Sequence, residues 1–130
     1  MRNLQTATAL LRRGNVVRIP RVKFSTGEIR DKFCVLLEDG GSFWRNGRIK
    51  GCLTTSKVPT PLKPWQVAVG QGFKILGEDQ KGTTYIDCRN IIFLDEQQLR
   101  RCKIVGDLPD EIIFQFNNAD EIAQCYERMA

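Results

Sequence analysis

The sequence predicts one mainly β domain, a small and strongly bent antiparallel barrel covered by a C-terminal helix. About six or seven short apolar runs, separated by turn signals, fill residues 14–94. From Asp95 onward the apolar spacing changes from two residues to three and four, as in helices. With 130 residues, 42% of them hydrophobic, the chain suits a single globular core. We therefore expect an N-terminal extension (1–13), the barrel (14–94) and a helical segment (95–130).

The first half of the barrel is expected to contain three strands, at residues 16–19, 32–37 and 49–54. Pro20 lacks a backbone N–H and should end the regular pairing of the first strand. The second strand is continuously apolar, which is typical of a strand buried on both faces. Turn signals at Asp39-Gly40-Gly41 and Asn46-Gly47 precede the third strand.

The second half follows a proline-rich loop at 57–64, which three prolines keep extended. Residues 65–69 and 73–75 alternate in polarity around Gly70-Gln71-Gly72, which predicts a hairpin. Two last strands are expected at 83–88 and 90–94, broken near Asp87-Cys88-Arg89.

Helices are expected at both ends of the chain. Residues 2–13 form a possible short helix, and residues 95–101 begin with acids and end with cations, which suits a helix dipole. Gly106 should stop that helix. A second C-terminal helix carries one apolar stripe, and Asn117-Asn118 should bend or split it; the stripe is Ile112, Phe116, Ala119, Ala123 and Tyr126.

Charge is distributed unevenly along the chain. Residues 1–50 hold eleven Lys or Arg and four Asp or Glu, whereas residues 101–130 hold three and six. A basic front half suggests a polyanionic partner, although a net charge of +5 also suits an ordinary solvated surface.

Several chemistries find no support in the residues. The chain has no histidine, and its five cysteines match no zinc spacing, so we expect no metal or other cofactor. Reduced cysteines serving as small hydrophobes explain the pattern best. No apolar run approaches a membrane span and no secretion signal is evident, so the protein is expected to be cytoplasmic.

Two strand ends carry the most informative polar groups. A charged loop with Glu28 and Arg30 enters the central strand at Lys32, and the next strand ends in Thr54-Thr55-Ser56-Lys57. If these ends lie side by side, they bring cations and hydroxyl donors together, as a phosphodiester site requires. The alternative is a solvated loop and a turn whose hydroxyls bond nearby backbone.

The order of these motifs resembles the MazF/PemK family of toxin endoribonucleases over roughly residues 14 to 128. Gly14-Asn15-Val16-Val17 is similar to the family's first strand, and Lys32 to Leu37 stands where the family has Arg-Pro-Ala-Val-Val-Leu. Thr54 to Lys57 and Val105 to Leu108 match two further family motifs. Lys32-Phe33 departs from Arg-Pro, and Asp87-Cys88-Arg89 reverses the Arg-Cys-Asp of some members.

The resemblance implies an SH3-like or PemK-like barrel, and metal-independent cleavage of single-stranded RNA through the substrate's own 2′-hydroxyl. It implies a homodimer and an acidic antitoxin partner of a type II toxin–antitoxin pair. We expect a catalytic set of Glu28, Arg30, Thr55 and Asp87, with Glu28 or Asp87 as base and Arg30 as phosphate clamp. RNA phosphates would meet further groups, namely Lys32, Thr54, Ser56, Lys57, Arg89, Arg45 and Arg48.

Two other hypotheses stay open. The first is a non-cleaving module on the same barrel, binding nucleic acid or a protein such as a topoisomerase; the two motif departures favour it. The second is an interaction protein with an incidental basic half. Arg45 follows Phe43-Trp44 and could join a base-stacking platform in a loop, although burial of the tryptophan is the simpler explanation.

Overall fold

A single curled antiparallel sheet forms the centre of the computed structural model, which describes residues 8–23, 25–55, 61–69 and 84–129. Its strand order is β4-β5-β3-β2-β1-β6. The strands are β1 (Asn15–Lys23), β2 (Ile29–Leu36), β3 (Ile49–Thr55), β4 (Gln66–Val69), β5 (Thr84–Leu94) and β6 (Lys103–Asp107). The helices are α2 (Gly41–Asn46), α3 (Glu96–Arg101) and α4 (Asp110–Met129). The mainly β fold with a covering C-terminal helix is thereby confirmed.

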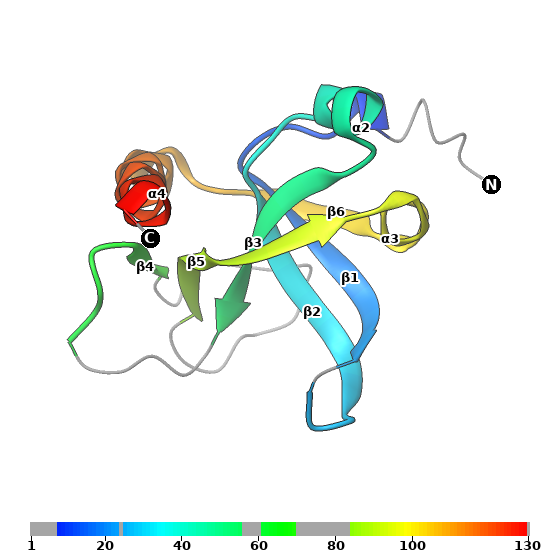
Figure 1. Ribbon diagram of the computed structural model, residues 1–130, viewed down its shortest axis with the longest axis horizontal. Coiled ribbons are helices and arrows are strands. Elements are labelled where there is room, and N and C mark those ends of the chain that lie inside the picture. The colour runs from blue at the N-terminus through cyan, green and yellow to red at the C-terminus, as the bar shows by residue number, and fades with distance from the viewer. Residues whose placement is uncertain (1–7, 24, 56–60, 70–83, 130) are drawn as a thin grey trace.

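Both faces of the sheet are buried where its central strands pair. Val35 faces a core that α4 closes with Phe116, and its neighbours Cys34 and Leu36 face the opposite core, which α3 closes with Leu99. This alternation follows from the two-residue period of a strand. Figure 1 shows α4 beside β4 and β5, with α3 on the far side near β6. The continuously apolar second strand is therefore buried on both faces, as its sequence predicts.

Irregular pairing bends the sheet in β1 and in β5. In β1 the pairing with β2 shifts between Ile19 and Val22, around the expected interruption at Pro20. In β5 the pairing with β3 jumps from Cys52–Ile91 to Thr54–Ile86. The break expected near Asp87-Cys88-Arg89 is thus a bulge within one continuous strand. Bulges of this kind sharpen strand twist and close small barrels.

Three local expectations are wrong. Residues 103–107 form strand β6 beside β1 rather than part of an all-helical segment. Residues 41–46 form α2, so Phe43-Trp44-Arg45 lies on a short helix rather than a loop. The helix α4 runs unbroken through Asn117-Asn118, because Phe116 and Ala119 on either side are anchored in the core.

Several expectations fall partly outside the described residues, among them the proline-rich loop, of which 57–60 are not described. The second half of the hairpin, at 73–75, and most of the N-terminal helix at 2–13 belong to the parts that are not described. The described strand β4 pairs with β5 through Thr84 to Asp87. Across the described ranges, no helix combines the length and apolar character needed to cross a membrane.

Candidate RNA-cleavage site

Strands β2 and β3 pair from Leu36 to Cys34 and then separate, which leaves a fork at the lower end of the sheet. Two side chains fill this fork. The Lys32 Nζ donates a hydrogen bond to the Thr54 carbonyl oxygen at 3.3 Å. The Thr54 hydroxyl donates to the Phe33 carbonyl oxygen, also at 3.3 Å. The structure therefore brings the two predicted strand ends side by side.

A row of polar side chains crosses three strands at this level. The Lys32 ammonium contacts the backbone of Thr54, the neighbouring residue Thr55 pairs with Tyr85 of β5, and the row thus runs from β2 through β3 to β5. Leu53 packs on the core that α3 closes, so Thr55, two residues further on, faces the same side. We call Lys32, Thr54, Thr55 and Tyr85 the fork cluster.

Tyr85 is a member that the sequence did not reveal. It follows the 70–83 segment and reads as an ordinary aromatic strand residue. Only the pairing register of β5 on β3 places it beside Thr55, and one sequence does not supply that register. Its half-buried phenol adds a hydrogen-bonding group to the cluster.

Two effects at the fork lower the pKa of the Lys32 ammonium group. Partial burial lowers the pKa of its ammonium group, and the positive charge of Arg30 lowers it further. Arg30 lies two residues away on the same strand, so both cations face the same side of β2. A lysine with a lowered pKa gives up its proton more readily than an ordinary surface lysine.

The two carboxylates predicted as bases lie in different places. Glu28 is exposed in the turn before β2, and the strand from Ile29 to Lys32 already spans roughly 10 Å. Asp87 shares a strand face with Tyr85 and is therefore nearer to Thr55. Its carboxylate accepts hydrogen bonds from the Gln66 side chain at 3.3 Å and from the Arg89 backbone N–H at 3.0 Å.

The predicted outer cations are not gathered at the fork. The Arg89 guanidinium stacks 4.8 Å from the Trp65 ring centroid and 5.2 Å from that of Tyr126. The Arg48 guanidinium lies 3.8 Å from the Phe93 centroid, and the Arg45 side chain donates to the Ser42 hydroxyl at 3.2 Å. Ser56 and Lys57 lie outside the described residues.

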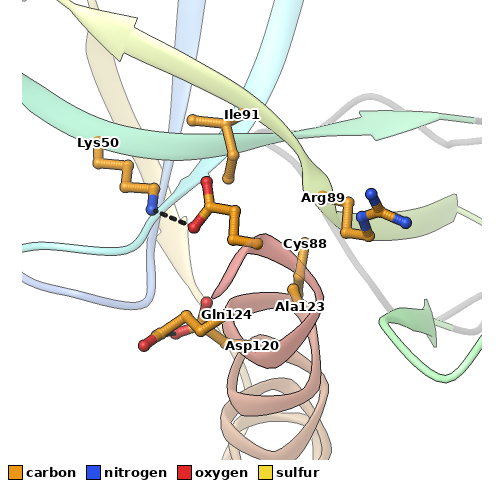
Figure 2. A pocket seen from close by; sticks show the side chains of 8 residues that line it. Lys50, Cys88, Arg89, Ile91, Asp120, Ala123 and Gln124 are labelled. Carbon is orange, nitrogen blue, oxygen red and sulfur yellow. Dashed lines mark hydrogen bonds and ion pairs between the residues drawn. The ribbon is translucent and has the colours of Figure 1, made fainter. Parts of the chain in front are cut away.

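A small pocket beside α4 is held together by the protein's own charges. Its volume is about 90 Å³, and Figure 2 shows Lys50, Arg89 and Asp120 around it. The Lys50 ammonium pairs with the Glu127 carboxylate at 3.6 Å. The buried Asp120 carboxylate binds the Arg13 guanidinium at 2.9 Å and the Gln124 amide at 3.1 Å. Because these charges have partners, we interpret the pocket as structural.

The cysteines behave as the composition suggests. All five are free, and Cys34, Cys52 and Cys88 are buried. Burial raises the pKa of the Cys34 thiol to about 12, so no reactive thiolate forms there near neutral pH. Across residues 8–23, 25–55, 61–69 and 84–129, acids and cysteines form no cluster of three that could hold a metal ion.

Comparison with known proteins identifies the fold. No protein-family model and no curated protein matches the chain by sequence. A chain of the MazE–MazF complex of Deinococcus radiodurans is similar in structure, with a TM-score of 0.64 and 15% identity; the match covers 92% of this chain and 96% of that one. A mycobacterial endoribonuclease matches with a TM-score of 0.60 and 18% identity, over 88% of this chain and 90% of its own.

A second mycobacterial endoribonuclease structure, in complex with its cognate antitoxin, matches with a TM-score of 0.59 and 17% identity. The match covers 88% of this chain and 94% of that one. The structures agree over nearly the full length of each protein, but the sequence identity is low. The comparison therefore shows a shared backbone fold. The chain therefore has a MazF-like fold, as the motif order in its sequence implies.

Proposed function

We propose that the protein is the toxin of a type II toxin–antitoxin pair, an endoribonuclease that cleaves single-stranded RNA without a metal ion. The observation that carries this proposal is the fork cluster, where Lys32, with its lowered pKa, lies against the end of β3. The MazF-like fold supports it, because similar structures are named endoribonucleases. Fold alone does not determine function, so the proposal depends on the cluster.

The proposed chemistry is an internal attack. The substrate's 2′-oxygen loses its proton and bonds to phosphorus, which passes through a five-coordinate phosphorane with additional negative charge. The bond from phosphorus to the 5′-oxygen then breaks, leaving a 2′,3′-cyclic phosphate and a 5′-hydroxyl. A cation and hydroxyl donors must stabilise the phosphorane, and an acid must protonate the departing oxygen.

The fork cluster supplies most of these roles. Lys32 stabilises the phosphorane and, with its lowered pKa, protonates the 5′-oxygen. The Thr55 hydroxyl donates to a non-bridging oxygen, and Arg30 clamps the phosphate through its planar fork. Of the two candidate bases, Asp87 is the better choice, because it shares a strand face with Tyr85 beside Thr55.

Cleavage of a long single-stranded RNA in EDTA tests this function. We would compare wild type with Lys32→Met and Thr55→Val, using Lys63→Met as the matched control, because Lys63 is an exposed lysine before β4. Lys32→Met should lower the cleavage rate by roughly 10²- to 10³-fold, with cyclic-phosphate ends on the wild-type products. Intact RNA after incubation with folded wild-type protein would overturn the enzymatic proposal.

A second candidate function is a non-cleaving binding module on the same fold. One observation favours it: each oxygen of the Asp87 carboxylate accepts a hydrogen bond from the protein itself, from the Gln66 side chain and the Arg89 backbone N–H, as in a purely structural role. The same experiment separates the two functions. RNA that is retained on the protein without any product would support the binding module.

Partners follow from the proposed function. Some similar structures are complexes with an antitoxin, so we propose an acidic antitoxin segment as the natural inhibitor, acting in the cytoplasm. We also propose a homodimer. Sedimentation equilibrium of the purified chain, alone and with an acidic peptide, would test both assignments.

A further inference from the structure

A concentration of cations lies away from the fork, where α3 and β6 meet β1. Three adjoining hollows open there, and Arg101 lines each of them. Asp31 is the one acid among the described residues that line them. We call this the α3–β6 surface; its cations are Arg18, Arg21, Lys23, Arg100, Arg101 and Lys103.

Four of these cations have no partner within the described chain. Arg18 is bound to Asp31, and Arg100 to Glu96 at 2.8 Å. The side chains of Arg21, Lys23, Arg101 and Lys103 form no hydrogen bond or ion pair with any described residue, and all four residues are exposed. Uncompensated like charges repel one another, so a surface of this kind binds anions favourably.

The backbone at Arg21 is held in an unusual conformation at this surface. Its φ is 56°, the left-handed region that non-glycine residues rarely adopt, and it lies in the β1 bulge. The Asp31 carboxylate accepts the Arg21 backbone N–H at 3.1 Å and so stabilises the bulge. Bulges re-aim side chains next to functional sites. Here the bulge directs Arg21 to the hollow that Arg101 also lines.

This surface is continuous with the fork through the β1–β2 ribbon. Val22 pairs with Arg30, and Lys23 pairs with Ile29, so the ribbon joins Arg21 and Lys23 to the strand that carries Lys32. Figure 1 shows β1 and β2 running together to the lower loop, with α3 and β6 on the same side as β1. An RNA strand that occupies the fork has to leave it, and the ribbon, which carries Arg30 on β2 and Arg21 on β1, connects the fork to this surface.

We propose that the α3–β6 surface binds the phosphate backbone of single-stranded RNA that extends beyond the fork. This assignment rests on the proposed function, since it takes the same RNA as its ligand. Arginine forks and lysine ammonium groups suit phosphates, and contacts to phosphates carry no base specificity. The surface therefore contributes affinity for long substrates without selecting their sequence.

The salt dependence of binding gives a quantitative test. For single-stranded nucleic acid, each neutralised phosphate contributes about 0.7 to the slope of log K against log salt concentration. The double variant Arg101→Ala/Lys103→Ala should therefore reduce this slope by about 1 to 1.5 for a long RNA. The matched control is Lys63→Ala/Arg128→Ala, which removes the same charge from exposed positions elsewhere. The control should change the slope by less than about 0.3.

Further arms distinguish this inference from the proposed function. The cleavage rate of a tetranucleotide that fills only the fork should be equal in the two double variants. The cleavage rate of the long RNA should fall in Arg101→Ala/Lys103→Ala and not in the control. If wild type cleaves RNA but both variants show the same salt slope, the inference is overturned and the function stands. If wild type cleaves nothing, but the salt slope falls in Arg101→Ala/Lys103→Ala and not in the control, the proposed function is overturned and the inference stands. If Arg101→Ala/Lys103→Ala loses binding to polyglutamate while its RNA binding is unchanged, the inference is also overturned, and the surface instead binds an acidic peptide.

Discussion

Cations on two sides of the sheet differ in what surrounds them. Beside α4, Arg13 is bound to buried Asp120, Lys50 to Glu127, and Arg89 is stacked on two aromatic rings. On the α3–β6 surface, Arg101 and Lys103 have no such partner among the described residues. A formal net charge of +5 does not distinguish these situations. The partners that each cation finds within its own chain separate a structural role from a binding role.

The largest expected effect is on the α4 side. Arg13→Ala would leave the Asp120 carboxylate buried without its cation, and would also remove the 2.9 Å hydrogen bond to the Leu37 carbonyl oxygen. We expect the free energy of unfolding to fall by about 3 kcal/mol, measured by urea denaturation. Arg128→Ala, an exposed cation of α4, should change it by less than about 0.5 kcal/mol. Equal effects of the two substitutions would contradict the comparison.

The next expected effect depends on pH. Hydrogen bonds from the Arg18 side chain, and then from the Arg21 N–H, lower the pKa of the Asp31 carboxylate. A lowered pKa means that the ionised group stabilises the folded chain above about pH 4, and that this contribution disappears as pH falls through the lower, folded value. Asp31→Asn should therefore be less stable than wild type at neutral pH, with the difference shrinking in acid. Thermal unfolding from about pH 7 down to about pH 2.5 measures it; a difference that is constant with pH would contradict the assignment.

A smaller effect is expected from Arg89. Its two ring contacts should contribute about 1 kcal/mol together, since the guanidinium is exposed. Arg89→Ala should therefore lower the free energy of unfolding while leaving RNA affinity close to that of wild type. Binding measured by fluorescence anisotropy at low salt provides the check. A large loss of affinity would instead support the sequence-based prediction that Arg89 contacts a phosphate.

The smallest effect is expected from the Lys50–Glu127 pair, which is 3.6 Å long and exposed at its glutamate end. Glu127→Gln should change the free energy of unfolding by at most about 0.5 kcal/mol, because exposed ion pairs contribute little. The same urea titration measures it, ideally at two salt concentrations. A loss larger than that of Arg89→Ala would reverse the expected order of the two contacts.

Much of the fold was predictable because its signals are local. The apolar run near Val35 and the capped helix after Asp95 carry their structure in neighbouring residues. Strand β6 was missed because its evidence is distant: Lys103 to Asp107 become a strand by pairing with β1. Helix α2 was missed because it has only six residues, and the Gly-Gly and Asn-Gly pairs at its two ends are typical of turns.

The residues of the candidate site also separate into those that local sequence signals identified and those that depend on distant contacts. Lys32 and Thr54 were identified because each stands at the end of a recognisable strand. Tyr85 and Arg21 were not, because one depends on the register of β5 and the other on a bulge held by Asp31. Arg89 was expected at a phosphate, but its stacking on Tyr126 depends on where α4 packs, which spacing along the chain does not indicate.

Strand β6 has one further consequence, for self-association. It is the outermost strand of the described sheet beside β1, and such an edge can recruit another chain through unpaired N–H and C=O groups. This edge is only five residues long, begins with an exposed lysine, and shifts register against β1 between Val16 and Val17. An approaching strand would find few consecutive bonds and would have to bury a charge, which protects the edge against aggregation.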